Sequence, residues 1–325
     1  MSVLAVRLRL AVSATLFPLA VAAEEGSFDR TLSVNGPVQL EVRTGSGSIE
    51  VLAGASGSVE VQGIIRARSG IFWGAGAADK VRRIEENPPI EQQGNVIRVG
   101  GSAIGDESFY EGVSISYRIV VPAETSLVSK TGSGSHRLSD LKGPVEAAAG
   151  SGSITMGSIG GDVQARAGSG SIRIDGVGGN LVVKTGSGSI DAHAVRGAIS
   201  ASAGSGRIEL EQTGEGDVSI DSGSGGVRVR GVRGGLSVST ASGSIRAQGE
   251  IVRDWSLEAS SGGITVELPP EASFELDAHT SSGDIDSDRP VAVTGRISRK
   301  SLRGAVGTGG PRLEIETSSG SIVIR

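Results

Sequence analysis

The 325-residue chain is long enough to bury a core, but only 3% of its residues are aromatic and 52 are Gly. It has no Cys, which excludes disulfides, thiol chemistry and a lipid-attachment cysteine. The formal net charge of −5 argues against nucleic acid and anionic membrane surfaces as general partners.

The N-terminus has the pattern of a secretory signal peptide, which we place at residues 1–23. Arg7 and Arg9 precede an apolar run, 10–21, and small residues follow before Glu24. The run is about a dozen residues long, whereas a membrane-spanning helix needs roughly 20. We therefore expect an exported protein, periplasmic, extracellular or at the cell surface, with no transmembrane segment after cleavage.

One short phrase then recurs through the mature chain, a Ser-Gly pair followed two residues later by an aliphatic residue. Its marker glycines are Gly47, Gly134, Gly152, Gly170, Gly188, Gly206, Gly225, Gly243, Gly262, Gly283 and Gly320. From Gly134 to Gly262 the steps are 18 or 19 residues, and steps of 21 and 37 follow. A fixed period of this length indicates stacked structural repeats.

The first phrase defines a first repeat unit at residues 24–52, and an insertion at 53–125 separates it from the next. Within the insertion, 77–86 has helical apolar spacing and stops at Asn87-Pro88-Pro89, so a short helix is expected there. Strands are expected at 58–65, 95–99 and 113–121. We interpret the insertion as a small β-rich cap that covers the open end of the repeats.

Residues 126–325 repeat one pattern of apolar positions. Counted from each marker glycine, positions −7, −5, +2 and +4 are apolar except at Ser129, His136 and Ser287. Alternation of this kind is typical of half-buried strands, so each unit is predicted to be two strands joined at the Gly-Ser-Gly turn. Parallel stacking of such units gives an all-β fold, a parallel β-solenoid (β-helix) with coils of about 18 residues.

The last part of the chain is less regular. The 37-residue step is close to two units, which predicts a degenerate coil between Gly283 and Gly320. The rod is expected to finish on the strand 321–325, with that end less protected than the N-terminal one.

The order of these elements resembles a bacterial family. A signal peptide, an early Gly-Ser-Ile unit, an insertion ending in Val121-Pro122 and then Thr-Gly-Ser-Gly-Ser-Ile units are typical of β-strand-repeat domains of unknown function labelled "putative adhesins". The closing segments 304–307 and 318–322 also fit. The resemblance implies a solenoid fold, an envelope location and no catalytic residues.

Metal ligands and cofactor motifs are not expected. The turns lack the recurrent Asp that a nine-residue calcium-binding repeat requires. Asp284, Asp286 and Asp288 face one way on a strand, but the EF-hand pattern fails because Gly295 stands where it requires Glu. We interpret the three carboxylates as a solvated acidic face.

Catalytic residues are not expected either. The histidines are His136, His193 and His279, and none shares a motif with a nucleophile or a paired acid. His136 takes the place of an inward Ile in the first coil after the insertion, and His279 is expected to face outward. The Ser before each marker glycine recurs in all eleven units, and we interpret it as a turn residue rather than a glycan-binding row.

The insertion also holds Phe72, Trp73, Phe109 and Tyr110, four of the nine Phe, Trp and Tyr residues. Aromatic side chains on loops favour contact with proteins and sugars, although packing of the cap is the commoner explanation. Trp73 and Tyr110 are the candidate contact residues. The partner expected is a cell-envelope protein or polysaccharide.

Together these features favour an exported, non-enzymatic β-solenoid that acts as an adhesin-like module or envelope scaffold. A polysaccharide-active envelope enzyme is one alternative, and it requires carboxylates clustered in a groove. An ordered-water or ice-binding solenoid is another, and it requires a flat, uniform Thr face. The mixed outward positions favour neither.

Overall fold

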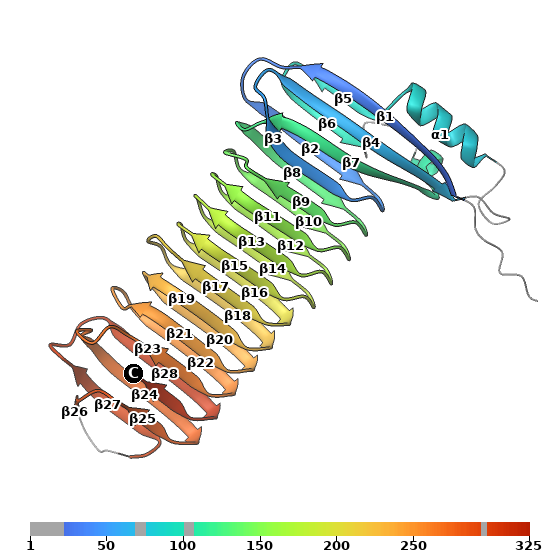
Figure 1. Cartoon of the computed structure of the whole chain (residues 1–325). Helices are drawn as coiled ribbons and strands as arrows, with labels where there is room; N and C mark the ends of the chain where they lie inside the picture. The colour runs from blue at the N-terminus through green and yellow to red at the C-terminus, as the bar shows by residue number, and fades with distance from the viewer. Residues whose placement is uncertain (1–22, 69–75, 101–106, 294–297) are drawn as a thin grey trace, which may run out of the picture.

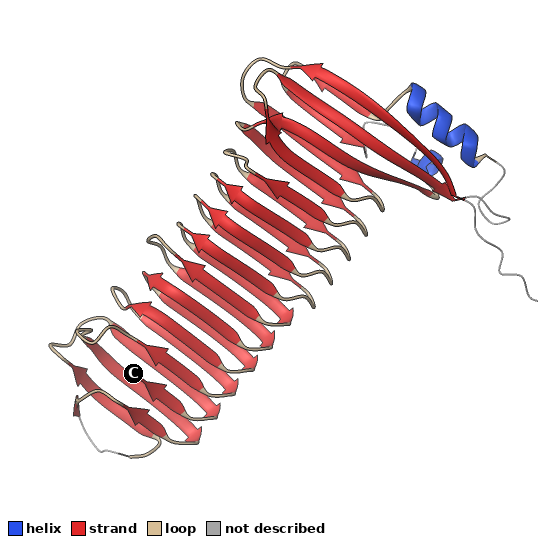
Figure 2. Cartoon of the chain, viewed as in Figure 1, coloured by secondary structure: helices blue, strands red, loops and turns tan. Residues whose placement is uncertain are grey.

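The computed structural model describes residues 23–68, 76–100, 107–293 and 298–325. Over these residues the chain forms a 14-stranded sheet and a 15-stranded sheet, here named sheet A and sheet B. The two sheets face each other along a rod, with the N-terminal cap at one end and the C-terminus near the other (Figure 1). Nearly all of the regular structure is strand (Figure 2). The parallel β-solenoid predicted from the period is confirmed.

Each regular coil contributes the strand before its Gly-Ser-Gly turn to sheet B and the strand after it to sheet A. The sheet B strands in chain order are β8 (Thr125–Thr131), β10 (Val145–Ala149), β12 (Val163–Ala167), β14 (Leu181–Thr185), β16 (Ile199–Ser205), β18 (Val218–Ser224), β20 (Leu236–Ser242) and β22 (Trp255–Ser261). The sheet A strands are β9 (His136–Ser139), β11 (Ile154–Ile159), β13 (Ile172–Val177), β15 (Ile190–Val195), β17 (Ile208–Gln212), β19 (Val227–Arg233), β21 (Ile245–Glu250) and β23 (Ile264–Glu267). Neighbours in each series pair in parallel, so chain order and spatial order agree here.

The core is a set of columns of like residues. Ile154, Ile172 and Ile190 stand in register on adjacent strands of sheet A and are at most 1% exposed. At the corner, a Cβ on Gly152 would lie 1.7 Å from the carbonyl oxygen of Gly134 in the neighbouring coil. The marker position therefore requires glycine because the backbones of successive turns touch there.

A second column fixes the same corner, three residues before the marker glycine. The Thr131 hydroxyl donates to the Gly47 carbonyl at 3.1 Å and accepts from the Gly134 amide at 3.1 Å. Thr185 does the same between Gly170 and Gly188. A hydroxyl that both donates and accepts satisfies two buried backbone groups of the turn.

The N-terminal end departs from chain order. β2 (Val38–Thr44) and β3 (Ile49–Gly54) form the first repeat unit, but β6 (Val96–Gly100) and β7 (Val113–Pro122) stack on its outer side as a further coil. The unit that is first in the chain is therefore second in space. β1 (Ala23–Ser33) and β4 (Ser58–Arg68) extend sheet A with antiparallel pairing, and β5 (Ile90–Gln93) is the edge of sheet B.

Helix α1 (Ala77–Glu86) lies where the sequence predicted a helix. Its buried residues Ala77, Val81 and Ile84 join the core cluster. A Cβ on Gly26 of β1 would lie 2.4 Å from Val81, so the helix packs closely on this strand. Helix α1 thus covers the end of the core beside β1 and β4 (Figure 1).

The C-terminal end corrects two expectations. β24 (Phe274–Ser282) and β25 (Ile285–Ser287) do not stack on β22 and β23, because β28 (Arg312–Ser319) and β29 (Ile322–Ile324) lie between them. The strand 321–325 therefore belongs to the second-to-last coil, and the prediction that it ends the rod is wrong. The predicted degenerate coil is also wrong: β26 (Val291–Val293) and β27 (Ser301–Val306) are antiparallel strands, and β27 pairs with β24.

The physical reason is that the apolar columns are interchangeable. Leu313 of β28 pairs in register with Trp255 of β22 on one side and with Leu276 of β24 on the other. A strand bearing this pattern fits between any two coils, so the pattern alone does not specify its neighbours. The placement also pairs both edges of β24, because β28 lies on its inner side and β27 covers its outer edge.

Candidate functional site

The N-terminal end has a cleft of about 600 Å³ between the cap and the first coils. It exists because the coil formed by β6 and β7 does not close with a Gly-Ser-Gly turn. Instead the chain leaves β6 at Gly100 and returns through the short 3₁₀ helix η2 (Glu107–Tyr110) to β7. Tyr110, Val113, Ile115 and Tyr117 form the cap side of the cleft.

Tyr110 is half-buried in this wall, and its ring packs edge-on against Phe109 with centroids 5.1 Å apart. Lys80 of α1 holds the segment, since its Nζ donates to the Glu111 carbonyl at 2.9 Å and lies 6.0 Å from the Phe109 ring centroid. Burial raises the pKa of Tyr110, so its hydroxyl stays protonated. The side chain presents an apolar ring face and a neutral hydrogen-bonding group.

Tyr117 lies deeper and is 3% exposed. Its ring meets Phe28 edge-on, with centroids 6.4 Å apart, which ties β1 to β7. Burial, and to a smaller extent the proximity of Tyr110, raises the pKa of Tyr117 well above its usual range. Tyr117 is therefore a neutral packing residue at the base of the cleft.

The opposite wall comes from sheet B. Arg43 and Lys130 reach the cleft, together with the backbone of the turns at Gly45, Gly132 and Gly150. Both cations already have partners: Arg43 pairs with Glu41, and Lys130 Nζ lies 3.5 Å from Glu146. The cleft therefore combines aromatic and aliphatic surface with largely neutralised charge, which suits a flat apolar face such as a sugar ring or an apolar side chain.

Of the two predicted contact residues, the structure places Tyr110 in this cleft. Trp73, like Phe72, lies outside the described residues. The sequence offered no sign of the cleft itself, because it depends on β6 and β7 forming a coil that the marker phrase does not identify.

His136 and Ser129, two of the three non-apolar inward positions, form one buried pair. They are 2% and 0% exposed, and Ser129 Oγ lies 2.8 Å from His136 Nδ1. His136 Nε2 lies 3.0 Å from the carbonyl oxygen of Ala148, which only accepts, so Nε2 carries the proton and Ser129 donates to Nδ1. Burial lowers the pKa of His136, which keeps the ring neutral, although its bond to Ala148 opposes this. The pair resembles a nucleophile and base but has no access to a substrate.

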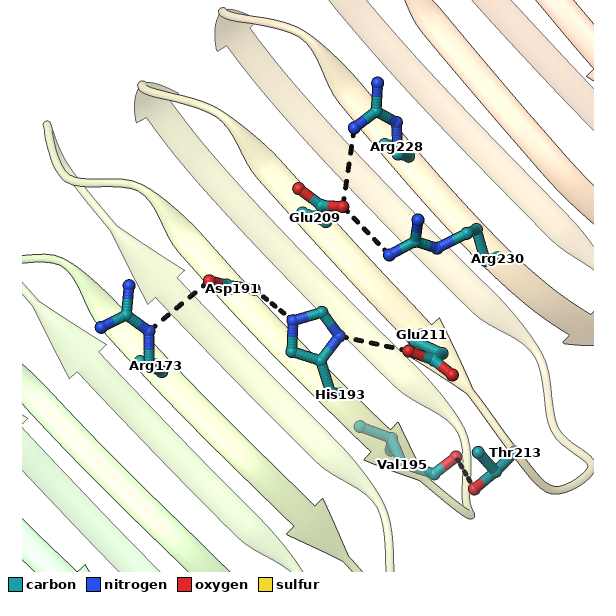
Figure 3. A network of polar contacts seen from close by, with 9 residues as sticks. All are labelled: Arg173, Asp191, His193, Val195, Glu209, Glu211, Thr213, Arg228 and Arg230. Atoms are coloured by element: carbon teal, nitrogen blue, oxygen red, sulfur yellow. Dashed lines mark hydrogen bonds and ion pairs between the residues drawn. The ribbon is translucent and has the colours of Figure 1, made fainter.

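His193 belongs to a surface network on sheet A (Figure 3). Its Nε2 lies 2.7 Å from Asp191 on the same strand, and its Nδ1 lies 3.3 Å from Glu211 on β17. Asp191 also pairs with Arg173 at 3.5 Å. On the next strand Glu209 pairs with Arg228 and Arg230 at 3.6 and 3.1 Å. The contacts of His193 with Glu211, of Asp191 with Arg173 and of Glu209 with Arg228 join adjacent coils, and the network lies on an open strand face.

The remaining polar candidates are exposed. Asp284, Asp286 and Asp288 flank and include β25 at the outer end of sheet A, and within the described residues no group of His, Asp and Glu is arranged to hold a metal ion. The Ser before each marker glycine is exposed in all eleven units. His279 faces outward on β24. In the part of the chain that is described, no helix is both long and apolar enough to span a membrane.

The sequence interpretation missed the threonine column at the corner. Its signal was present, since Thr44, Thr131, Thr185, Thr280 and Thr317 all stand three residues before a marker glycine. It also missed that Ser129 and His136 would meet. Both exceptions to the apolar pattern fall in one coil, on strands that face each other, which was sufficient to pair them.

Comparisons with known proteins give the following. No curated protein matches the chain. A crystal structure of a putative cell adhesion protein from Clostridium sporogenes ATCC 15579 is 11% identical, with 93% of this chain and 99% of that chain covered and a TM-score of 0.25. One of a putative adhesin from Bacteroides fragilis NCTC 9343 is 11% identical, with 92% and 97% covered and a TM-score of 0.31.

A third crystal structure, of a putative lipid binding protein from Parabacteroides distasonis ATCC 8503, is 10% identical, with 92% and 96% covered and a TM-score of 0.34. Similarities with TM-scores this low carry no argument about what this chain binds. The family comparison is decisive, because the model of a domain of unknown function matches residues 92–325 and the resemblance noted in the sequence is confirmed. The chain belongs to the Toastrack DUF4097 family.

Proposed function

We propose that the protein is an exported, non-enzymatic binding module of the cell envelope, adhesin-like or scaffolding, that contacts its partner through the cleft at the cap. The observation that carries the proposal is the half-buried Tyr110 ring in the wall of a cleft of about 600 Å³, on the part of the molecule where the repeat is broken. Aromatic side chains in a cleft supply large contact area at low entropic cost. The partner class is an envelope protein or a polysaccharide.

Export is supported by the sequence of residues 1–23. A mature chain of this kind reaches its partner in the periplasm or at the cell surface. N-terminal sequencing of the protein from the envelope fraction is expected to give Ala23 or Glu24, and an intact Met1 would contradict export by cleavage.

The non-enzymatic part of the proposal is supported by where the titratable groups lie. Ser129 and His136 are buried together, and His193 is held between two carboxylates on an open face. Tyr110 and Tyr117 are kept protonated, so they donate hydrogen bonds rather than act as bases. A hydrolase or lyase activity on envelope polysaccharide that one point substitution abolishes would reject this part of the proposal.

The test compares Tyr110→Ala with Tyr110→Phe in the full-length exported protein. Each variant is cross-linked in its own envelope, and partner capture and melting temperature are measured together. We expect Tyr110→Ala to lose capture with little change in melting temperature, and Tyr110→Phe to retain most capture because the ring face remains. Trp73→Ala is measured alongside as the second candidate contact.

Arg246→Ala, on the outer face of sheet A far along the rod, is the matched surface control and is expected to bind normally. A large fall in the melting temperature of Tyr110→Ala would assign the ring to packing of the cap. Unchanged capture in a stable Tyr110→Ala variant would reject the cleft as the contact site.

A further inference from the structure

One column of side chains on the outer face of sheet B separates charge along the rod. The column four residues before the marker glycine is basic toward the N-terminal end and acidic toward the C-terminal end. In spatial order its residues are Arg43, Lys130, Ala148, Arg166, Lys184, Ser202, Asp221, Ser239, Glu258, Glu316 and His279. Ser202 on β16 lies at the change of sign.

This column places like charges side by side. Arg166 is the register partner of Lys184, and Glu258 is the register partner of Glu316. Strands in a sheet are about 4.8 Å apart, and like charges at that separation destabilise the sheet. Among the described residues, none of these four side chains forms an ion pair, and neither does Asp221. An arrangement that lowers the stability of a single molecule indicates that these charges interact with another molecule.

The outer face of sheet A also has like-charged register partners, Asp191 beside Glu209 and Arg228 beside Arg246, but three of these four side chains form ion pairs. There Arg173 pairs with its register partner Asp191, and Glu209 pairs with its register partner Arg228. The same strand spacing therefore permits charge neutralisation across coils. Sheet B has the same backbone, and two cations of its column pair within the chain, Arg43 with Glu41 and Lys130 with Glu146. The charges of Arg166, Lys184, Asp221, Glu258 and Glu316 have no ion-pair partner in the described part of the chain.

We propose that the outer face of sheet B docks on the same face of a second copy of this chain, with the two rods antiparallel. A two-fold axis along β16 carries each strand to the one equally far on the other side of Ser202. Lys184 and Asp221 are each one strand from Ser202, so Lys184 of one copy faces Asp221 of the other. Symmetry makes each such contact twice.

A second charged contact follows from the same axis. Lys130 and Glu316 are both four strands from Ser202, so they also face each other between copies. Arg166 faces Ser239 and lies one strand from both Asp221 and Glu258 of the second copy. Arg166, Lys184, Asp221, Glu258 and Glu316, which form no ion pair among the described residues, thus face or adjoin opposite charges of the second copy. Lys130 adds such a contact although it also pairs with Glu146 of its own chain.

The neighbouring outward column, six residues before the marker glycine, fits the arrangement by size near the axis. Val182, Gln164 and Glu146 lie one, two and three strands from β16 and face Ser219, Ser237 and Ser256 of the second copy, so long side chains meet small ones there. Farther out Val128 faces Glu314, and Glu41 faces Asp277, where each carboxylate is held by an Arg of its own chain. From β2 to β24 the face measures roughly 800 Å² per copy at about 4.8 Å per strand and about 3.3 Å per residue, which matches the area of a standard stable interface.

Sedimentation of the mature chain at about 50 mM and about 0.5 M salt tests the proposal, since a shorter Debye length weakens charge pairing. We expect a dimer at low salt and weaker association at high salt. Lys184→Glu and Asp221→Lys are each expected to raise the dimer Kd by about tenfold or more, equivalent to at least about 1.4 kcal/mol. The Lys184→Glu/Asp221→Lys double variant is expected to restore association, because the swapped charges face each other again.

Lys184 and Asp221 are exposed and do not line the cap cleft, so these variants are expected to fold with the cleft intact. Arg246→Glu on sheet A is the control and is expected to leave the Kd unchanged. A monomer at every concentration at low salt would overturn the proposal. So would a dimer that the single variants do not weaken, or one that the charge swap does not restore.

Discussion

The middle of the rod and its two ends are built from the same coil but follow different rules. From β10 to β23 each coil stacks on the previous one in the chain, with apolar columns and glycine corners. At each end the order is exchanged: β6 and β7 stack outside β2 and β3, and β28 and β29 lie inside β24 and β25. The interchangeable middle coils form a scaffold. The two ends must stop the stacking, so the structures that do not repeat, the cap with its cleft and the antiparallel strands β26 and β27, lie there.

Stopping the stacking requires special contacts because an open coil end presents unpaired strand edges. At the C-terminal end Asp277 of β24 pairs with Arg303 of β27 at 2.7 Å and with Arg312 of β28 at 2.9 Å. At the N-terminal end antiparallel strands, α1 and the Tyr110 segment replace the regular coil. The cleft arises there because the chain no longer follows the repeat.

The largest expected effect comes from breaking the period in the middle. Deleting residues 172–189 removes one whole coil, so the flanking columns still match and a shorter rod is expected to fold. Deleting residues 172–180 places corners against strands and inward residues outward, and we expect loss of the folded state. Circular dichroism and thermal melting of the two variants distinguish these outcomes. Equal stability of the two deletions would contradict the solenoid.

A large but local effect is expected from truncation before Arg312. This removes β28 and β29 from inside the rod, so β25 loses the strand it pairs with and β24 keeps only β27. Hydrogen exchange is expected to show loss of protection from β24 onward, while the middle coils stay protected. Retained protection of β24 would mean that it pairs with β22, as chain order suggests.

A single inward substitution in the middle is expected to cost less. Ile190 is 1% exposed and stacks between Ile172 and Ile208, so Ile190→Ala should reduce the free energy of unfolding by about 2–5 kcal/mol. Arg246→Ala on the outer face serves as the comparison and should change it by about 0.5 kcal/mol or less. Denaturant titration measures both. Similar small losses would place the Ile190 side chain outside the core.

A smaller effect on the free energy of unfolding is expected at the buried polar pair Ser129 and His136 near the N-terminal end. Ser129→Ala leaves His136 Nδ1 without a donor, and His136→Ile leaves the Ser129 hydroxyl unpaired in the core. The double variant has the Ala and Ile found at the corresponding positions of the next coil. We expect its free energy of unfolding to exceed that of either single variant by about 1–3 kcal/mol. Strict additivity in the cycle would show that the two side chains do not interact.

The same pair predicts a pH dependence. The pKa of His136 is lowered in the folded protein by burial, so below its ordinary value of 6.5 the unfolded chain binds more protons. The stabilising contribution of neutral His136 to the free energy of unfolding is therefore fully present above about pH 6.5. It is lost as the pH falls through the pKa of His136 in the folded protein. His136→Ile is expected to flatten this acidic loss in pH-dependent unfolding, and an unchanged slope would contradict the burial.

Much of this architecture follows from the sequence because inward positions repeat at a fixed spacing. The marker glycines specify the corners, and Ala77, Val81 and Ile84 specify the helix of the cap. Spatial order at the ends does not follow, since Leu313 matches the columns of both Trp255 and Leu276. Register is encoded by the pattern, but the choice among equivalent neighbours depends on contacts such as those of Asp277.

The candidate site was only partly visible in the sequence. Tyr110 stood out because aromatic residues are few, but the cleft depends on β6 and β7, whose residues lack the Gly-Ser-Gly turn. The charge column of sheet B was present in the sequence as well. Its separation into two halves becomes meaningful only when the strands are placed side by side in register.

Disulfide trapping tests most directly the claim that the ends of the rod reverse chain order. Because the chain has no Cys, only the introduced cysteines can form a disulfide. On the outer face of sheet A, Val323 of β29 is the register partner of Thr265 of β23 and of Asp286 of β25. A disulfide requires Cα atoms within about 7 Å, which adjacent strands satisfy and strands two apart do not. The Thr265→Cys/Val323→Cys and Val323→Cys/Asp286→Cys variants are predicted to cross-link under mild oxidation, and Thr265→Cys/Asp286→Cys is not. Efficient cross-linking of the last pair alone would place β25 next to β23 and contradict the account.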